Sequence, residues 1–362
     1  GDGLGAASFG RFSLIGAMMF QAEILGIAGC LPDKVVTNDD LASLHPDWDM
    51  PRIAAKTGIV ARHIAAETET ACDLAFQAAS KLLERGIVPK QEIDYLIVVT
   101  QTPDHLLPSN ACQLQARLKL GSHLAALDLN IGCSGFVGGL HLSTSLIQSG
   151  QARNVLLITT DTYSKILHPQ DRTVRALFGD GAAATLVGCS RSEGRIGQFV
   201  LGTNGSKAGD LIVPAGGFRQ PRSEQTAQQQ VDAQGCVRNA DSLFMDGQAI
   251  FTFALTEIPK SISQLLKKAD LTAQQVDWYI FHQANRFMLE NLAAIGRISP
   301  DKMVYHLESI GNTVAASIPL AMEHYLIDQR IQPGQNLILA GFGVGLSWAA
   351  CHVVWGQASA TS

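Results

Sequence analysis

The feature that most constrains the fold is an internal repeat, in which apolar runs and turns occur twice in the same order. Asp94-Tyr-Leu-Ile-Val-Val in the first half matches Asp277-Trp-Tyr-Ile-Phe in the second, and Gln151-Ala-Arg-Asn-Val-Leu-Leu-Ile matches Pro333-Gly-Gln-Asn-Leu-Ile-Leu. Continuous apolar runs are typical of strands that are covered on both faces. Because helical patterns separate these runs, the sequence predicts an α/β protein made of two halves related by a pseudo-twofold axis.

A polar, turn-like stretch over 191–195 separates the two halves. We therefore expect one half over 20–190 and the other over 191–362. Residues 1–19 are rich in Gly and Ala and precede the first predicted strand, over 23–28, so they are expected to form a tail. This tail has no basic n-region, which argues against a signal peptide.

Composition narrows the class of protein further. The chain is 46% hydrophobic and 16% charged, and its formal net charge of −5 argues against a nucleic-acid binder, which would carry a basic patch or stripe. No apolar run approaches the roughly 18 residues of a membrane helix. The seven cysteines are odd in number and dispersed, without a C-x-x-C pair. This usage predicts a reducing, cytoplasmic compartment and neither a disulfide framework nor a metal site.

The stretch around Cys133 is the first candidate for chemistry. A short apolar run over 124–129 predicts a buried strand, and Asn130, Gly132 and Gly135 form a turn before a helix rich in small residues. Cys133 should therefore lie at or near a helix N-terminus, where the helix dipole favours a thiolate. The alternative is a buried structural thiol, since cysteine is among the most buried residues.

Two further candidates stand at matching places in the second half. His282 directly follows the strand predicted over 278–281, and Asn312 precedes an Ala-rich helix. Each has an ordinary alternative: a histidine satisfied within the core, and a helix N-cap. Pseudo-twofold symmetry would bring both residues to Cys133 at strand ends near the junction, where ligand sites of α/β proteins usually lie.

Several local expectations accompany this interpretation. They are a strand over 303–307, a glycine-rich loop over 341–345, a long polar surface loop over 216–235, and Thr68 as the N-cap of the helix that follows it.

The motifs around these candidates resemble β-ketoacyl-acyl carrier protein synthase III, a family of the thiolase superfamily. The resemblance runs from about residue 23 to 354 and rests on Leu129-Asn-Ile-Gly-Cys-Ser-Gly-Phe136, His282-Gln-Ala-Asn285, Ile310-Gly-Asn-Thr-Val-Ala-Ala-Ser-Ile-Pro319 and Gly341-Phe-Gly-Val-Gly-Leu-Ser-Trp348. It implies a five-layered αβαβα fold, a homodimer and a Cys-His-Asn triad. It also implies a condensing enzyme of fatty acid biosynthesis that uses acyl-CoA and malonyl-acyl carrier protein (malonyl-ACP) as substrates and needs no cofactor.

The resemblance assigns roles to the three candidates. Cys133 would accept the acyl group from acyl-CoA. His282 and Asn312 would bind the thioester carbonyl of malonyl-ACP, whose decarboxylation gives the carbanion for a Claisen condensation. The backbone N–H groups of Cys133 and Val344 would form the oxyanion hole.

The same resemblance gives positions for substrate contacts. The expected CoA-binding residues are Arg52, Lys56, Arg172, Gly247, Phe251, Asn285 and Arg286, and the expected acyl-pocket residues are Leu107 and Phe342. Three positions depart from the family pattern: Arg52 replaces a stacking Trp, Lys56 replaces an Arg, and the basic residue after Asn285 is shifted by one position. Leu107 would reach the partner subunit's acyl pocket. It is smaller than the Phe of short-primer enzymes and predicts a longer primer.

Three other functions remain open at this point. A same-fold acyltransferase would pass the acyl group to an amine, alcohol or other acceptor without decarboxylation. A papain-like cysteine hydrolase has the same chain order of Cys, His and Asn, but Cys-Ser-Gly-Phe and a half-repeat are not typical of it. The third alternative is a catalytically silent subunit.

Overall fold

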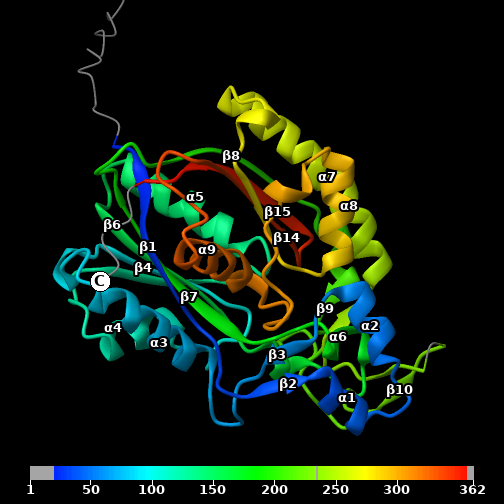
Figure 1. Ribbon diagram of the computed structural model, residues 1–362. Helices are drawn as coiled ribbons and strands as arrows, with labels where there is room; N and C mark the ends of the chain where they lie inside the picture. The colour runs from blue at the N-terminus through cyan, green and yellow to red at the C-terminus, as the bar shows by residue number, and fades with distance from the viewer. Residues whose placement is uncertain (1–19, 234, 357–362) are drawn as a thin grey trace, which may run out of the picture.

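Two mixed β-sheets, one from each half of the repeat, form the frame of the molecule (Figure 1). The computed structural model describes residues 20–233 and 235–356, so the predicted tail over 1–19 lies outside the described residues. The first sheet has the order β1-β7-β6-β4-β5. Its strands are β1 (Ala22–Cys30), β7 (Gly181–Cys189), β6 (Asn154–Asp161), β4 (Tyr95–Val99) and β5 (Ala125–Leu129).

The second sheet repeats this pattern with one strand fewer. Its order is β13-β14-β15-β8, and its strands are β13 (Trp278–Phe281), β14 (Asn336–Gly343), β15 (Ser347–Val354) and β8 (Arg195–Thr203). In the first sheet β7 pairs antiparallel with β1 and with β6, and β6 pairs parallel with β4. In the second sheet β15 pairs antiparallel with β8 and with β14, and β14 pairs parallel with β13 in the same way. The two halves therefore share one topology, as the internal repeat predicts.

Hydrogen bonds at equivalent positions confirm the repeat in detail. The carboxylate of Asp94 accepts the Asn154 backbone N–H at 3.1 Å, and that of Asp277 accepts the Asn336 backbone N–H at 2.7 Å. In return, the Asp94 and Asp277 backbone N–H groups each donate to the carbonyl of the same asparagine at 2.9 Å. Each pair ties the start of a parallel strand to that of its neighbour.

The strand predicted over 303–307 is not formed. This segment would correspond to β5, but it makes only an isolated bridge between Met303 and Tyr279. The Gln283 side chain holds it instead, donating to the Val304 carbonyl at 3.2 Å and accepting the His306 backbone N–H at 2.7 Å. Hydrogen bonds with the Gln283 side chain thus replace most of the backbone pairing at this sheet edge. The segment over 303–307 is apolar because it is buried, not because it forms a strand.

Helices complete five alternating layers, which confirms the predicted αβαβα fold. α3 (Ala71–Glu84) and α4 (Asn110–Arg117) cover the outer face of the first sheet, and α7 (Gly247–Ala269) covers the second sheet with α8 (Arg286–Gly296) packed on it. α5 (Gly135–Gln148) and α9 (Ser317–Ile327) form the middle layer, between the sheets (Figure 1).

Short elements lie at one end of the layers, beside the junction. They are α1 (Asn38–Leu44), α2 (Met50–Thr57), α6 (Arg172–Arg175), the pair β2 (Val35–Thr37) and β3 (Ala61–His63), the pair β9 (Leu211–Ile212) and β12 (Phe244–Met245), and the pair β10 (Gln230–Val231) and β11 (Val237–Arg238). The polar segment over 216–235 is therefore interrupted by β10 and is not loop throughout.

Three further expectations need correction. α3 is capped by Thr70, two residues after the predicted Thr68, and Thr70 forms a capping box with Asp73. β5 is only partly buried, because it is the edge strand of its sheet. β14 continues through Gly343, so most of the predicted loop over 341–345 is strand. Among the helices of the described residues, none has the length and apolar character needed to cross a membrane.

Candidate active site

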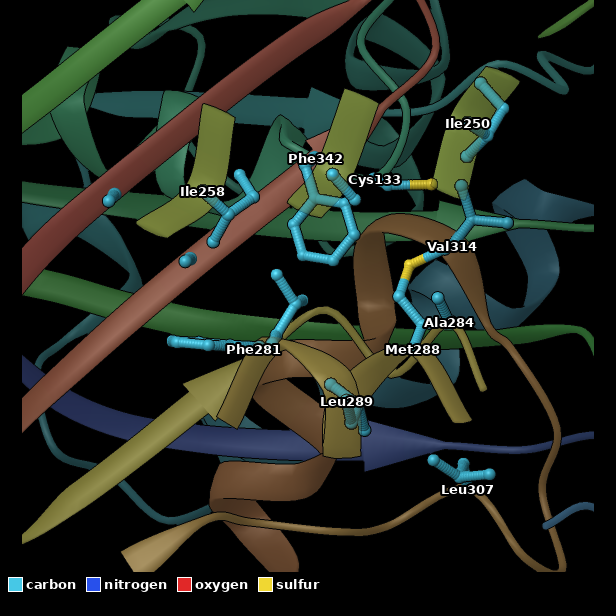
Figure 2. Close-up of a cluster of buried hydrophobic side chains, with 14 of the residues drawn as sticks. Cys133, Ile250, Ile258, Phe281, Ala284, Met288, Leu289, Leu307, Val314 and Phe342 are labelled. Atoms are coloured by element: carbon cyan, nitrogen blue, oxygen red, sulfur yellow. The ribbon is translucent and has the colours of Figure 1, made fainter. Parts of the chain in front are cut away.

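Cys133 lies in the turn that joins β5 to the middle-layer helix α5. Ser134 occupies the N-cap position of α5, so Cys133 stands just before the helix N-terminus, as predicted. Its side chain is 5% exposed and packs among residues from the second half. Figure 2 shows its sulfur among Ile250 of α7, Phe342 of β14 and Val314.

Two glycines of β14 make room for this cysteine. A Cβ added to Gly341 would meet the Cys133 carbonyl oxygen at 2.4 Å, and one added to Gly343 would meet Cys133 Sγ at 2.9 Å. Both distances are too short for a real Cβ contact, so only glycine allows the strand to pass the turn at backbone distance. This close approach also brings the Val344 backbone N–H to the sulfur.

The electrostatics of Cys133 differ from the expectation of a favoured thiolate. Burial raises the pKa of Cys133 to about 12, and the negative charge of the nearby Asp161 carboxylate adds to this rise. Hydrogen bonds from the backbone N–H groups of Cys133 and Val344 oppose it. Burial outweighs the helix N-terminus, so the resting side chain is a thiol. The two N–H groups are nevertheless those that the family resemblance assigns to an oxyanion hole.

His282 follows β13 and is buried, with 2% exposure. Burial lowers the pKa of His282 to about 3, while a hydrogen bond with the Val314 backbone acts in the opposite direction. The ring is therefore neutral at physiological pH. Its Nδ1 lies 2.8 Å from Oγ of Ser317, the first residue of α9.

Asn312 lies beside His282 on the segment that precedes α9. Its Oδ1 accepts the Val314 backbone N–H at 2.9 Å, which fixes the orientation of the amide and turns Nδ2 toward the histidine. Asn312 Nδ2 and His282 Nε2 are 3.5 Å apart. Oδ1 caps a backbone N–H, as the N-cap alternative suggested, while Nδ2 remains directed at the histidine.

One pocket connects this group of residues to the surface. It has a volume of about 1150 Å³ and is lined by Cys133, His282 and Asn312 together with Phe342, Gly343 and residues of α2, α6, α7 and α8. Symmetry-based reasoning thus placed the three candidates correctly in one cavity. The lining also includes seven other residues named from the sequence, which are Arg52, Lys56, Arg172, Gly247, Phe251, Asn285 and Phe342.

Two of the residues named for CoA or acyl binding do not line this pocket. The guanidinium of Arg286 lies 5.4 Å from the centre of the Tyr305 ring and 4.0 Å from the Glu308 carboxylate, so it is engaged elsewhere. Leu107 is 81% exposed and lies outside the cavity of its own chain. Asn285 does line the pocket, but its Oδ1 caps α8 by accepting the Met288 N–H.

Sequence reasoning missed an aromatic pair at the pocket mouth. Phe251 and Phe287 stack with ring centroids 5.3 Å apart, and the Lys56 ammonium lies 5.6 Å from the Phe287 centroid. Phe287 is 41% exposed. In the sequence, the basic residue after Asn285 is shifted by one position from the family pattern. As a result, Phe287 lies at the pocket mouth where the family pattern would place an arginine.

A cysteine before a helix N-terminus, with a neutral histidine and an asparagine from the opposite half of a five-layered αβαβα fold, defines the class of thiolase-like condensing enzymes. The two family models that match describe 3-oxoacyl-[acyl-carrier-protein] synthase III, over residues 127–205, and the C-terminal part of the same enzyme, over residues 266–355. A β-ketoacyl-[acyl-carrier-protein] synthase III of Caldanaerobacter subterraneus subsp. tengcongensis is 36% identical over 337 residues, which cover 93% of this chain and 98% of that protein. The chain therefore belongs to the β-ketoacyl-acyl carrier protein synthase III family.

Solved structures agree with this assignment. A 3-oxoacyl-(acyl-carrier-protein) synthase III structure has 48% sequence identity and a TM-score of 0.90, covering 92% of this chain and all of the other. A 3-oxoacyl-(acyl-carrier protein) synthase of Burkholderia xenovorans LB400 has 36% identity and a TM-score of 0.86, covering 93% of this chain and 95% of that one.

Proposed function

We propose that this condensing enzyme loads an acyl group from acyl-CoA onto Cys133 and then condenses it with malonyl-ACP to give a β-ketoacyl-ACP. The observation that carries the proposal is the presence of two separate sets of donors in one pocket. Backbone N–H groups of Cys133 and Val344 face the sulfur, and the side-chain nitrogens of His282 and Asn312 converge 3.5 Å apart. Two sets of donors suit a reaction with two oxyanions.

In the first half-reaction the Cys133 sulfur attacks the thioester carbonyl of acyl-CoA. A bond forms between sulfur and the acyl carbon, the bond from that carbon to the CoA sulfur breaks, and CoA leaves as a thiol with the proton that Cys133 loses. The N–H groups of Cys133 and Val344 stabilise the tetrahedral oxyanion. Because the resting group is a thiol, proton loss accompanies attack rather than preceding it.

In the second half-reaction malonyl-ACP replaces CoA in the pocket. The bond to the carboxylate breaks, CO₂ leaves, and the electron pair forms an enolate whose oxygen accepts hydrogen bonds from His282 and Asn312. The enolate carbon then attacks the acyl carbon on Cys133, and the sulfur departs as a thiolate that regains a proton. A neutral histidine suits this role, since it donates from Nε2 without removing a proton.

The pocket mouth has the chemistry for the nucleotide part of CoA. Arg52, Lys56 and Arg172 supply positive charge for its phosphates, and the stacked rings of Phe251 and Phe287 offer a flat surface beside them. We assign this mouth to CoA, with Arg52 in the position of the family's tryptophan.

A homodimer is the expected assembly. Among the described residues, β5 is a half-buried edge strand that pairs only with β4, and such an edge is a template for pairing with a second copy. Leu106 and Leu107 lie in the segment that connects β4 of the same sheet to α4. Their exposed fractions are 79% and 81%, which is unusual for neighbouring leucines. We propose that pairing across β5 covers this surface and carries Leu107 toward the partner's acyl pocket.

A cytoplasmic setting fits the same function. All seven cysteines are free, and one of them is the proposed nucleophile. A reducing compartment would keep that thiol available.

Carboxyl-labelled malonyl-ACP tests the proposed function. The pure protein, first acylated by acyl-CoA, should release labelled CO₂ and form β-ketoacyl-ACP, and Cys133→Ala should form neither an acyl adduct nor the condensation product. Transfer of the acyl group to an amine or alcohol without CO₂ release would instead support the acyltransferase alternative.

A further inference from the structure

The hydroxyl of Ser317 lies within hydrogen-bond distance of the ring of His282. Ser317 is 1% exposed at the start of α9, and its Oγ lies 2.8 Å from His282 Nδ1 and 3.3 Å from the Gln283 backbone nitrogen. The Gln283 N–H can only donate, so Oγ accepts there. Within residues 20–233 and 235–356, no other acceptor is hydrogen-bonded to this hydroxyl. Its own proton is therefore directed to Nδ1.

This direction determines where the imidazole carries its proton. A neutral imidazole has one N–H, and a ring whose Nδ1 accepts a hydrogen bond must carry that proton on Nε2. Nε2 is the nitrogen that faces Asn312 Nδ2 at 3.5 Å. Two donors at this separation can bind one oxygen atom between them, whereas a lone pair on Nε2 would repel an enolate oxygen.

We propose that Ser317 is a positioning residue that holds His282 in the Nε2–H tautomer and so keeps both donors directed at the enolate oxygen. The inference rests on the proposed function, in which that oxygen develops during loss of CO₂ from malonyl-ACP. Ser317 itself does not touch the reacting atoms. It should matter for decarboxylation and not for acylation of Cys133, because the sulfur's oxyanion donors are backbone N–H groups.

Ser317→Ala removes the hydroxyl with little change in volume, and Ser143→Ala is a matched control. Ser143 is fully buried on α5, the other helix of the middle layer, and its hydroxyl bonds within that helix to the Gly139 carbonyl at 2.8 Å. We expect S317A to lower the rate of malonyl-ACP decarboxylation by about 100-fold. A ring protonated on Nδ1 no longer donates from Nε2, and the loss of one hydrogen-bond donor to an oxyanion usually has an effect of about this size. Acylation of Cys133, followed by intact mass, should change by less than about 3-fold. S143A should match the wild type in both.

Nitrogen NMR of the ¹⁵N-labelled imidazole gives a readout that a purely structural role would not change. In the wild type Nδ1 should show the shift of an unprotonated acceptor, and in S317A part of the population should carry the proton on Nδ1. Ser317→Cys retains a weak donor and should recover part of the decarboxylation rate.

Three results separate this inference from the proposed function. A wild-type ring protonated on Nδ1 would overturn the role of Ser317, whether or not any variant folds. Decarboxylation by S317A at the wild-type rate would also overturn it. A wild type with an Nε2–H ring that releases no CO₂ would contradict the proposed function while supporting the tautomer assignment.

Discussion

Gly343 lies against Cys133 so closely that a Cβ on the glycine would stand 2.9 Å from the cysteine sulfur and 3.0 Å from its Cβ. The space that this missing side chain leaves is the space next to the nucleophile. β14 ends at Gly343, and the backbone N–H of the next residue, Val344, donates to the sulfur. Strand β14 is thus part of the site as well as of the sheet.

Gly343→Ala should slow acylation of Cys133 while leaving the fold intact. The added methyl group contacts Sγ, whose side chain can shift slightly, but the shift moves the nucleophile from its donors. We expect the acylation rate to fall at least about 10-fold, measured by intact mass against time.

Gly341→Ala is the control for Gly343→Ala. Its methyl group would meet the rigid Cys133 backbone at 2.4 Å, so the free energy of unfolding should fall by about 1–3 kcal/mol. Rapid acylation of G343A, or equal loss of stability in both variants, would contradict this account of the strand.

The decarboxylation step should not report a histidine titration near neutral pH. Burial lowers the pKa of His282 from its ordinary 6.5 to about 3, so the ring stays neutral as the pH falls through 6.5. The rate of CO₂ release should therefore be independent of His282 ionisation between about pH 5.5 and 8.5. A loss of rate with an apparent pKa near 6.5, matched by titration of the His282 ring nitrogens at the same pH in ¹⁵N NMR, would show a ring that titrates normally.

The paired aspartates of the repeat should contribute to stability independently of each other. Asp94→Ala and Asp277→Ala each remove an acceptor from a strand N–H group, and each should lower the free energy of unfolding by about 1–3 kcal/mol. Because the sites lie in different sheets, the double variant should show the sum to within about 0.5 kcal/mol. Denaturant titration measures all three, and strong non-additivity would mean that the halves are coupled through these positions.

Assembly can be tested at Leu107. Leu107→Glu places a charge on the surface proposed to meet a second copy, so it should convert a dimer to a monomer in light-scattering measurements at micromolar concentration. Leu44→Glu is the matched control, because Leu44 is 69% exposed on α1, away from β5. A wild-type monomer, or a dimer that L107E leaves unchanged, would contradict pairing across this edge.

Much of the fold was predictable because buried strands leave long apolar runs in the sequence. The matched apolar runs after Asp94 and Asp277 indicated the internal repeat, and the polar residues at the ends of the predicted strands indicated the position of the active site. The segment over 303–307 was misassigned because burial alone makes a run apolar, whether or not it pairs. Gln283 clamps this segment by side-chain hydrogen bonds that no periodic pattern reveals. The division of the chain near residue 190 stays a prediction.

The parts of the site that the sequence did not reveal depend on three-dimensional contacts. Ser317 stands at a helix start, where serine is common for reasons of capping, so nothing in the sequence ties it to His282. The rise in the pKa of Cys133 depends on burial and on Asp161, which is 28 positions away in the chain. Arg286 stands next to Asn285 in the sequence, yet the first turn of α8 directs it to Tyr305.

The stoichiometry of a single turnover shows whether loss of the acyl group from Cys133 is coupled to decarboxylation of malonyl-ACP. Protein acylated at Cys133 and freed of acyl-CoA is mixed with one equivalent of carboxyl-labelled malonyl-ACP, and the mass of the protein, the CO₂ and the ACP product are measured together. Each acyl group lost from Cys133 should yield one CO₂ and one β-ketoacyl-ACP. Loss of the acyl group without CO₂, or CO₂ release without a carbon–carbon bond, would contradict the proposed function.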